Sequence, residues 1–319
     1  MIIKKVLQNS EFQEKPPVLI DVGASGAIHQ VWKEIAEFSI CVGFDADTRA
    51  TNFTVSEDKG FKKLYVLNKL IGEKEGLRPF YLTESPYCSS TLEPDADALK
   101  PYHFSSLFRV KSKVDLSVVD LKSALTTVNI DYVDWFKTDS QGTDLGVFKG
   151  LGPQLLSKVI VAEFEPGIMD AYKGEDKMHA IMAFMEARHF WLCDLKLKGP
   201  VRISNDNLQK YFGKLIHEKI ESVHRGMPFW GEMTYLSDMT THQSKRDVLF
   251  ACVCALIHEQ YGFCIELALR GTVAYGDEIF EEITEYAVNK IKGNVSFSLR
   301  RQFYSQKFKR FVKRILGRK

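Results

Sequence analysis

The chain has 319 residues, of which 45% are apolar and 26% charged, which is typical of a folded globular protein with one large domain and room for a smaller one. No run approaches the roughly 18 apolar residues of a membrane-spanning helix, and the longest apolar run, 248–257, predicts a buried helix. The N-terminus lacks the apolar core of a signal peptide, so we expect a cytoplasmic protein. The six cysteines form no zinc pattern, which predicts reduced thiols and no metal site.

Strands and helices alternate over the first 240 residues. Short apolar or alternating runs predict strands at 18–22, 40–47, 63–72, 77–83, 131–139, 158–166, 189–197 and 229–238. Apolar residues at helical spacing predict helices at 28–38, 144–151 and 177–188. This alternation is typical of an α/β fold with a doubly wound, mostly parallel sheet. Beyond residue 240 the pattern is helical, at 244–269 and 277–292. We therefore expect a sheet domain at 1–240 and a helical extension at 241–319.

The first predicted strand ends in a turn that is suited to a ligand. The residues along this turn are Asp21, Val22, Gly23, Ala24, Ser25 and Gly26. In open α/β sheets, ligands bind beyond the carboxyl ends of the strands, where glycine lets the backbone approach them and a helix N-terminus offers free N–H groups. Counted from Gly23, serine and isoleucine replace the second and third glycines of the dinucleotide fingerprint G-x-G-x-x-G. The alternative is an ordinary strand–turn–helix corner.

S-adenosylmethionine is the adenosine ligand that this turn suits better, because it has no pyrophosphate. Its ammonium could face Asp21, or Asp21 could orient the loop through hydrogen bonds. The next predicted strand supplies Asp45, 24 residues after Asp21, where an acid could bind the ribose hydroxyls. An acid at this place serves either adenosine ligand, so Asp45 does not decide between them.

Several motifs follow one another in a recognisable order over residues 15–240. They are DVGASGAIHQVW, VGFDAD, the stretch 68–95 with Ser89 and Ser90, the stretch 114–151, and VIVAEFE. In this order they resemble the FkbM-type S-adenosylmethionine-dependent methyltransferases. The resemblance implies a Rossmann-like methyltransferase fold with S-adenosylmethionine as cofactor. Position 141, where that family usually has an acid, is Gln141 here, which argues against a base at this position.

Together with the turn and strand-end residues, the resemblance gives a set of expected cofactor contacts. They are Asp21, Gly23, Ala24, Ser25, Gly26, Asp45, Ala46, Ser89, Ser90 and Asp139.

Methyl transfer to a hydroxyl benefits from alignment of the reactants and from a base. Asp139 ends the strand at 131–139, at the edge where the cofactor would lie, and is the first candidate base; the alternative is a carboxylate that caps the next turn or helix. Lys137 points to the same side and could pair with Asp139 or meet an anionic substrate; the alternative is a sheet-edge ion pair. Glu163 and Glu165 share one face near a later strand end, and Glu163 is the third catalytic candidate; solvated acids are the alternative.

The C-terminus is a basic segment on an acidic body. From Arg300 onward there are nine Lys or Arg and no acid, so the rest of the chain carries a net charge of −7. Apolar residues recur at helical spacing within residues 298–319, which predicts a basic amphipathic helix that binds an anionic membrane surface. A helix packed on the body is the main alternative. Nucleic acid is the weaker one.

These patterns predict a cytoplasmic methyltransferase that is peripheral at the inner membrane face. The family resemblance implies a carbohydrate or glycolipid acceptor, methylated on a sugar hydroxyl of a surface polysaccharide or glycolipid. One alternative is a methyltransferase for another small metabolite. Another is a cofactor-binding scaffold protein without catalysis, which Gln141 favours.

Overall fold

The computed structural model describes residues 2–23, 29–47, 60–212, 216, 219–220, 226–242 and 244–316, with backbone alone at 297 and 299–316. The chain divides into two compact units, Leu7–Gln243 and a helical unit of Met1–Val6 with Ser244–Lys319. The sequence analysis divides the chain near residue 240 and assigns the first six residues to the sheet domain, whereas in the structure they group with the helical unit.

A seven-stranded sheet forms the larger unit, in the order β3-β2-β1-β7-β8-β10-β9. The strands are β1 (Val18–Val22), β2 (Ile40–Phe44), β3 (Lys63–Leu67), β7 (Trp135–Thr138), β8 (Val161–Phe164), β9 (Phe190–Lys198) and β10 (Trp230–Ser237). The pairs from β3 to β8 are parallel, and β10 is antiparallel to both of its neighbours. The predicted α/β class and mostly parallel sheet are therefore confirmed. The strand order reverses between β1 and β7, which makes the junction of these two strands the switch point of the sheet.

A second, three-stranded sheet has the order β4-β6-β5. Its strands are β4 (Leu70–Gly72), β5 (Gly76–Thr83) and β6 (Val110–Asp120). The single strand predicted at 63–72 is thus wrong, because the chain turns after Leu67 and β4 joins this other sheet. The sequence pattern does not predict β6, because most of the first seven side chains of this strand are exposed and its lysines and serines interrupt the apolar pattern.

Short helices complete the larger unit. They are α2 (Ser10–Glu14), α3 (Ala96–Leu99), α4 (Leu121–Thr126), α5 (Asp144–Lys149), α6 (Gly152–Leu156), α7 (Met178–Glu186) and α8 (Asn205–Tyr211), with 3-10 turns η1 (Gln30–Glu34), η2 (Ala36–Phe38), η3 (Pro86–Cys88) and η4 (His103–Phe108). Phe148 of α5 and Ile181 of α7 share one buried core with Ile20 and Phe136 of the sheet. The α-helix predicted at 28–38 is wrong for its described part, which forms η1 and η2. Apolar residues three apart fit a 3-10 turn as well as an α-helix.

Four helices form the helical unit: α1 (Ile2–Leu7), α10 (Lys245–Ile257), α11 (Tyr261–Tyr275) and α12 (Ile279–Leu316). The buried helix predicted at 248–257 is confirmed by α10. The predicted helix 244–269 is divided between α10 and α11, where Glu259 takes a left-handed φ of 56°. Gly271 lets α11 approach α12, because a Cβ there would lie 2.3 Å from the Phe280 ring.

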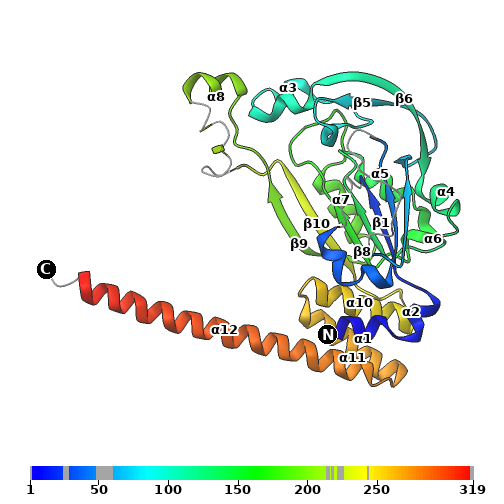
Figure 1. Cartoon of the computed structure of the whole chain (residues 1–319), viewed down its shortest axis with the longest axis vertical. Coiled ribbons are helices and arrows are strands. Elements are labelled where there is room, and N and C mark those ends of the chain that lie inside the picture. The colour runs from blue at the N-terminus through cyan, green and yellow to red at the C-terminus, as the bar shows by residue number, and fades with distance from the viewer. Residues whose placement is uncertain are drawn as a thin grey trace. The chain divides into compact units, whose positions relative to one another are not determined.

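The last helix, α12, continues without a break for 38 residues (Figure 1). None of the described helices is long and apolar enough to span a membrane. All six cysteines are free thiols, and five of them are buried. Among the described residues, no group of three or more His, Cys, Asp or Glu side chains could hold a metal ion.

Candidate active site

The strand ends at the switch point are tied together by backbone hydrogen bonds. The N–H of Gly23, just after β1, donates to the carbonyl of Phe44 at 2.9 Å, and the N–H of Asp139, just after β7, donates to the carbonyl of Val22 at 2.9 Å. Gly23 has a φ of +83°, and a Cβ at this position would lie 2.2 Å from the Asp139 carbonyl oxygen. Only glycine fits there, because the Asp139 carbonyl approaches the backbone so closely and the φ is left-handed.

A first pocket of about 110 Å³ lies at these strand ends. Its lining includes five of the expected cofactor residues: Gly23, Asp45, Ala46, Ser89 and Asp139. The other residues of the turn, Ala24, Ser25 and Gly26, lie outside the described part of the chain. The structure thus brings expected residues from β1, β2, β7 and the loop after β5 into one pocket.

Asp45 follows β2 and is only partly buried. Its Oδ1 accepts a hydrogen bond from the Asp47 N–H at 2.8 Å, and Oδ2 bonds to no described residue. Burial raises the pKa of Asp45 to about 6, and the Asp47 N–H opposes this shift. One carboxyl oxygen is therefore left to accept a hydrogen bond from a ligand hydroxyl.

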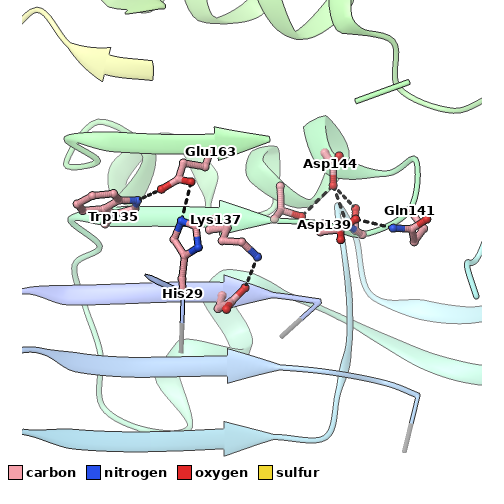
Figure 2. Close-up of polar contacts among 10 residues, drawn as sticks. His29, Trp135, Lys137, Asp139, Gln141, Asp144 and Glu163 are labelled. Atoms are coloured by element: carbon pink, nitrogen blue, oxygen red, sulfur yellow. Dashed lines mark hydrogen bonds and ion pairs between the residues drawn. The ribbon is translucent and has the colours of Figure 1, made fainter. Parts of the chain in front are cut away.

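Asp21 and Lys137 form a buried ion pair across β1 and β7 (Figure 2). The Lys137 Nζ lies 3.0 Å from the Asp21 Oδ1, and their side chains are 16% and 7% exposed. Burial lowers the pKa of Lys137, but the charges of Asp21 and Asp139 outweigh it and raise the pKa above its usual value. Neither Asp21 nor Lys137 is among the described residues that line the first pocket. Lys137 therefore forms the ion pair that was one of its predicted roles, with Asp21 as its partner.

Asp139 bonds to a glutamine that a tyrosine orients. The Gln141 Nε2 donates to the Asp139 Oδ1, while the Gln141 Oε1 accepts a hydrogen bond from the Tyr172 hydroxyl at 2.9 Å. Gln141 has a left-handed φ of 57°, which brings its side chain back over Asp139 (Figure 2). Burial raises the pKa of Asp139 to about 6, and the Lys137 charge opposes this shift.

The turn after Asp139 is held by a different carboxylate. The Asp144 Oδ1 accepts hydrogen bonds from the N–H and Oγ of Ser140, at 2.9 and 2.7 Å, and from the Thr138 Oγ1 at 3.0 Å. The capping function considered for Asp139 thus belongs to Asp144, and the Asp139 carboxylate caps none of the described helices.

A second pocket of about 360 Å³ adjoins the first. Tyr87, Asp139 and Gln141 line both pockets, so Asp139 stands where they meet. Six of the described residues that line the second pocket are aromatic, and Glu165 lies among them. The arrangement can hold two ligands side by side, with a carboxylate at the junction.

Glu163 lies away from both pockets. Its carboxylate accepts a hydrogen bond from the Trp135 Nε1 and lies 3.0 Å from the His29 Nε2, a group that Figure 2 shows apart from Asp139 and Gln141. Glu165, just beyond the end of β8, lines the second pocket instead. Of these two acids, Glu163 is the predicted catalytic candidate, whereas Glu165 is the one that lines a pocket.

The two predicted loop serines have different environments. Ser89 lines the first pocket and accepts a hydrogen bond from the Thr83 N–H at 3.3 Å. Ser90 instead donates to the Gln141 carbonyl at 2.7 Å and accepts from the Leu92 N–H at 3.0 Å. Ser90 therefore fixes the loop that carries Gln141.

No family model matches the chain, and a search of curated proteins finds no match either. The likeness to FkbM-type methyltransferases accordingly rests on the motifs themselves.

Proposed function

We propose that this protein is a cytoplasmic S-adenosylmethionine-dependent methyltransferase that methylates a sugar hydroxyl in a surface polysaccharide or glycolipid. The observation that carries the proposal is the position of Asp139 at the junction of two pockets, beyond the carboxyl ends of β1 and β7. The FkbM-type family and its doubly wound Rossmann-like methyltransferase fold belong to the same proposal. The mostly parallel sheet and the motif order support them.

The residues of the first pocket fit the cofactor, because the Asp45 carboxyl that lines it keeps one oxygen without a partner among the described residues. The Gly23 backbone would border the cofactor, and Asp45 would accept hydrogen bonds from the ribose hydroxyls. Bound S-adenosylmethionine would supply a methyl group activated by its sulfonium sulfur.

Asp139 would take the proton of the acceptor hydroxyl onto a carboxylate oxygen, a contribution of about 10²–10⁴-fold for a placed base. Gln141 donates to one oxygen of that carboxylate, which favours the ionised, proton-accepting form. The aromatic walls of the second pocket would exclude water from this proton transfer.

Asp45→Ala should weaken S-adenosylmethionine binding by about 1–3 kcal/mol, the usual cost of losing hydrogen bonds to a charged group. Calorimetry on the purified protein measures this loss. Asp131→Ala, which removes an exposed carboxylate from the chain before β7, serves as the control and should bind like the wild type. Tight NAD binding without S-adenosylmethionine binding would contradict the proposed cofactor.

The non-catalytic alternative rests on Gln141 in place of an acid. In the structure Gln141 bonds to Asp139 rather than replacing it, so the candidate base is still present. Formation of S-adenosylhomocysteine from S-adenosylmethionine and a crude glycan extract would separate an enzyme from a scaffold. A product that forms only with other small metabolites would favour the alternative acceptor.

We also propose that residues 298–319 bind an anionic membrane surface at the inner face of the membrane. The supporting observation is that α12 is helical as far as Leu316, so the backbone has the form that the amphipathic pattern requires. Each Lys or Arg near such a surface contributes roughly 1 kcal/mol, less as salt screens it.

Removal of the residues after Asn294 should abolish co-sedimentation with anionic liposomes and leave cofactor binding unchanged. A triple variant of the full-length chain should bind anionic liposomes roughly tenfold or more weakly at low salt; its substitutions are Lys307→Gln, Lys309→Gln and Lys313→Gln. Lys111→Gln with Lys113→Gln, on the exposed part of β6, is the control. Equal binding of all these proteins, or equal binding to neutral liposomes, would place the membrane contact elsewhere.

A further inference from the structure

The charges of the second pocket restrict its ligand. Among the described residues that line it, every charged side chain is a carboxylate: Asp139, Glu165 and Glu175. The Glu175 Oε1 is already occupied, because it lies 2.6 Å from the Lys177 Nζ and accepts a hydrogen bond from the Ala171 N–H at 2.8 Å. Asp139 and Glu165 are therefore the acids that a ligand meets, and the ionised Asp139 would repel an anionic ligand.

Glu165 is the group of this pocket that is left to bind a ligand. It follows β8 directly, and its carboxyl makes no hydrogen bond to a described residue. Burial, followed by the charge of Asp139, raises the pKa of Glu165 to about 8. Lys137 opposes this shift, and Glu232 and Asp144 add to it. In the empty pocket at neutral pH the carboxyl is thus mostly protonated, able both to donate and to accept a hydrogen bond.

The aromatic walls are fixed by contacts with one another. The Phe104 and Phe229 rings meet edge to face at 5.4 Å, and the Phe108 and Tyr172 rings lie 5.6 Å apart. Trp230 completes this wall, with its ring 6.4 Å from that of Phe229. Rigid aromatic faces suit a ligand with an apolar ring face, while a few polar groups fix its orientation.

A neutral sugar ring has this combination of features, with C–H bonds on its faces and hydroxyl groups at its edge. An amine acceptor fits less well, because the neighbouring Asp139 carboxylate favours the ammonium form, which has no lone pair to receive a methyl group. An acidic sugar would bring its carboxylate against the ionised Asp139.

We propose that the second pocket is the acceptor site and takes an uncharged sugar ring, with the reacting hydroxyl at Asp139 and a second hydroxyl of the same ring bonded to Glu165. This inference rests on the proposed function for the role of Asp139. The aromatic wall holds the face of the ring, and Glu165 selects its orientation.

Ligand-observed NMR on the full chain without cofactor tests the sugar class. The probes are the neutral methyl glycosides of glucose, galactose, mannose and rhamnose, together with methyl glucuronide and methyl glucosaminide. We expect at least one neutral glycoside to bind, and the glucuronide to bind at least tenfold more weakly. Equal or tighter binding of the glucuronide, binding of the glucosaminide alone, or no binding of any neutral glycoside would overturn the proposal.

Variants of Glu165 test its contact with the sugar. Glu165→Leu should weaken binding of the neutral glycoside at least tenfold, whereas Glu165→Gln, which keeps both a donor and an acceptor, should weaken it less. Glu186→Leu, which changes an exposed acid at the end of α7, should bind like the wild type. Unchanged binding in Glu165→Leu would remove Glu165 from the site. Calorimetry with S-adenosylmethionine, run separately, would show whether the proposed function fails on its own.

Discussion

Asp139→Asn is expected to lower methyl-transfer turnover by about 10²-fold or more, with the fold and cofactor binding retained. Asparagine has the shape of aspartate but cannot accept the proton of a hydroxyl acceptor. The substitution should leave the turn intact, because Asp144 rather than Asp139 receives the hydrogen bonds of Ser140. Product formation under single-turnover conditions measures the effect on the methyl-transfer step.

The pH dependence gives this prediction a second readout. Burial raises the pKa of Asp139 to about 6, and the ionised form is the one that accepts a proton. Wild-type turnover should therefore fall as the pH is lowered through about 6, and Asp139→Asn should lose this dependence. Asp131→Asn, which changes an exposed carboxylate before the same strand, should keep wild-type turnover. Near wild-type turnover in Asp139→Asn would show that Asp139 is structural.

In the proposed mechanism, Gln141 leaves Asp139 as the single carboxylate at this place. A second acid at position 141 would lie against Asp139, and the two would compete for one proton. The amide instead donates to Asp139, and Tyr172 orients it by donating to the amide oxygen. The departure from the family pattern at position 141 is therefore compatible with catalysis by Asp139.

The central strands could be predicted because a buried parallel strand is a short apolar run that ends in turn residues. The strand predicted at 18–22 has the observed bounds for this reason. The same rule fails for β6, whose first half is exposed on a small separate sheet, so no continuous apolar run marks it. It also fails at residues 63–72, where an apolar run passes from one sheet to another through a turn.

The part of the site that lies at the ends of the parallel strands could be predicted from the sequence. Asp45 and Asp139 follow parallel strands, and the carboxyl ends of such strands meet at one edge of the sheet. The sequence pattern could not separate Glu163 from Glu165 correctly, because residues two apart on a strand share one face. The contacts with Trp135 and His29 show that Glu163 is occupied. Tyr172 comes from a later loop whose position depends on tertiary contacts.

The register of the sheet also determines which carboxylate pairs with Lys137. The alternation of side chains along a strand does not determine this partner. Lys137 and Asp21 are direct neighbours across the parallel pair β7 and β1. Lys137→Met is therefore expected to lower the free energy of unfolding by about 3–5 kcal/mol, because it leaves the Asp21 carboxylate buried without its counter-charge. Urea unfolding at pH 7 measures the loss.

The double variant Asp21→Leu with Lys137→Met tests this explanation directly. Removing both charges should restore most of the lost stability, because an apolar pair of similar size avoids the cost of burying an unpaired charge. Lys173→Met is the matched control. It breaks an ion pair with Glu93 at 2.9 Å whose side chains are 57% and 50% exposed, and solvent screens such a pair. Equal losses in Lys137→Met and Lys173→Met would show that the burial of the Asp21–Lys137 pair adds nothing to its effect on stability.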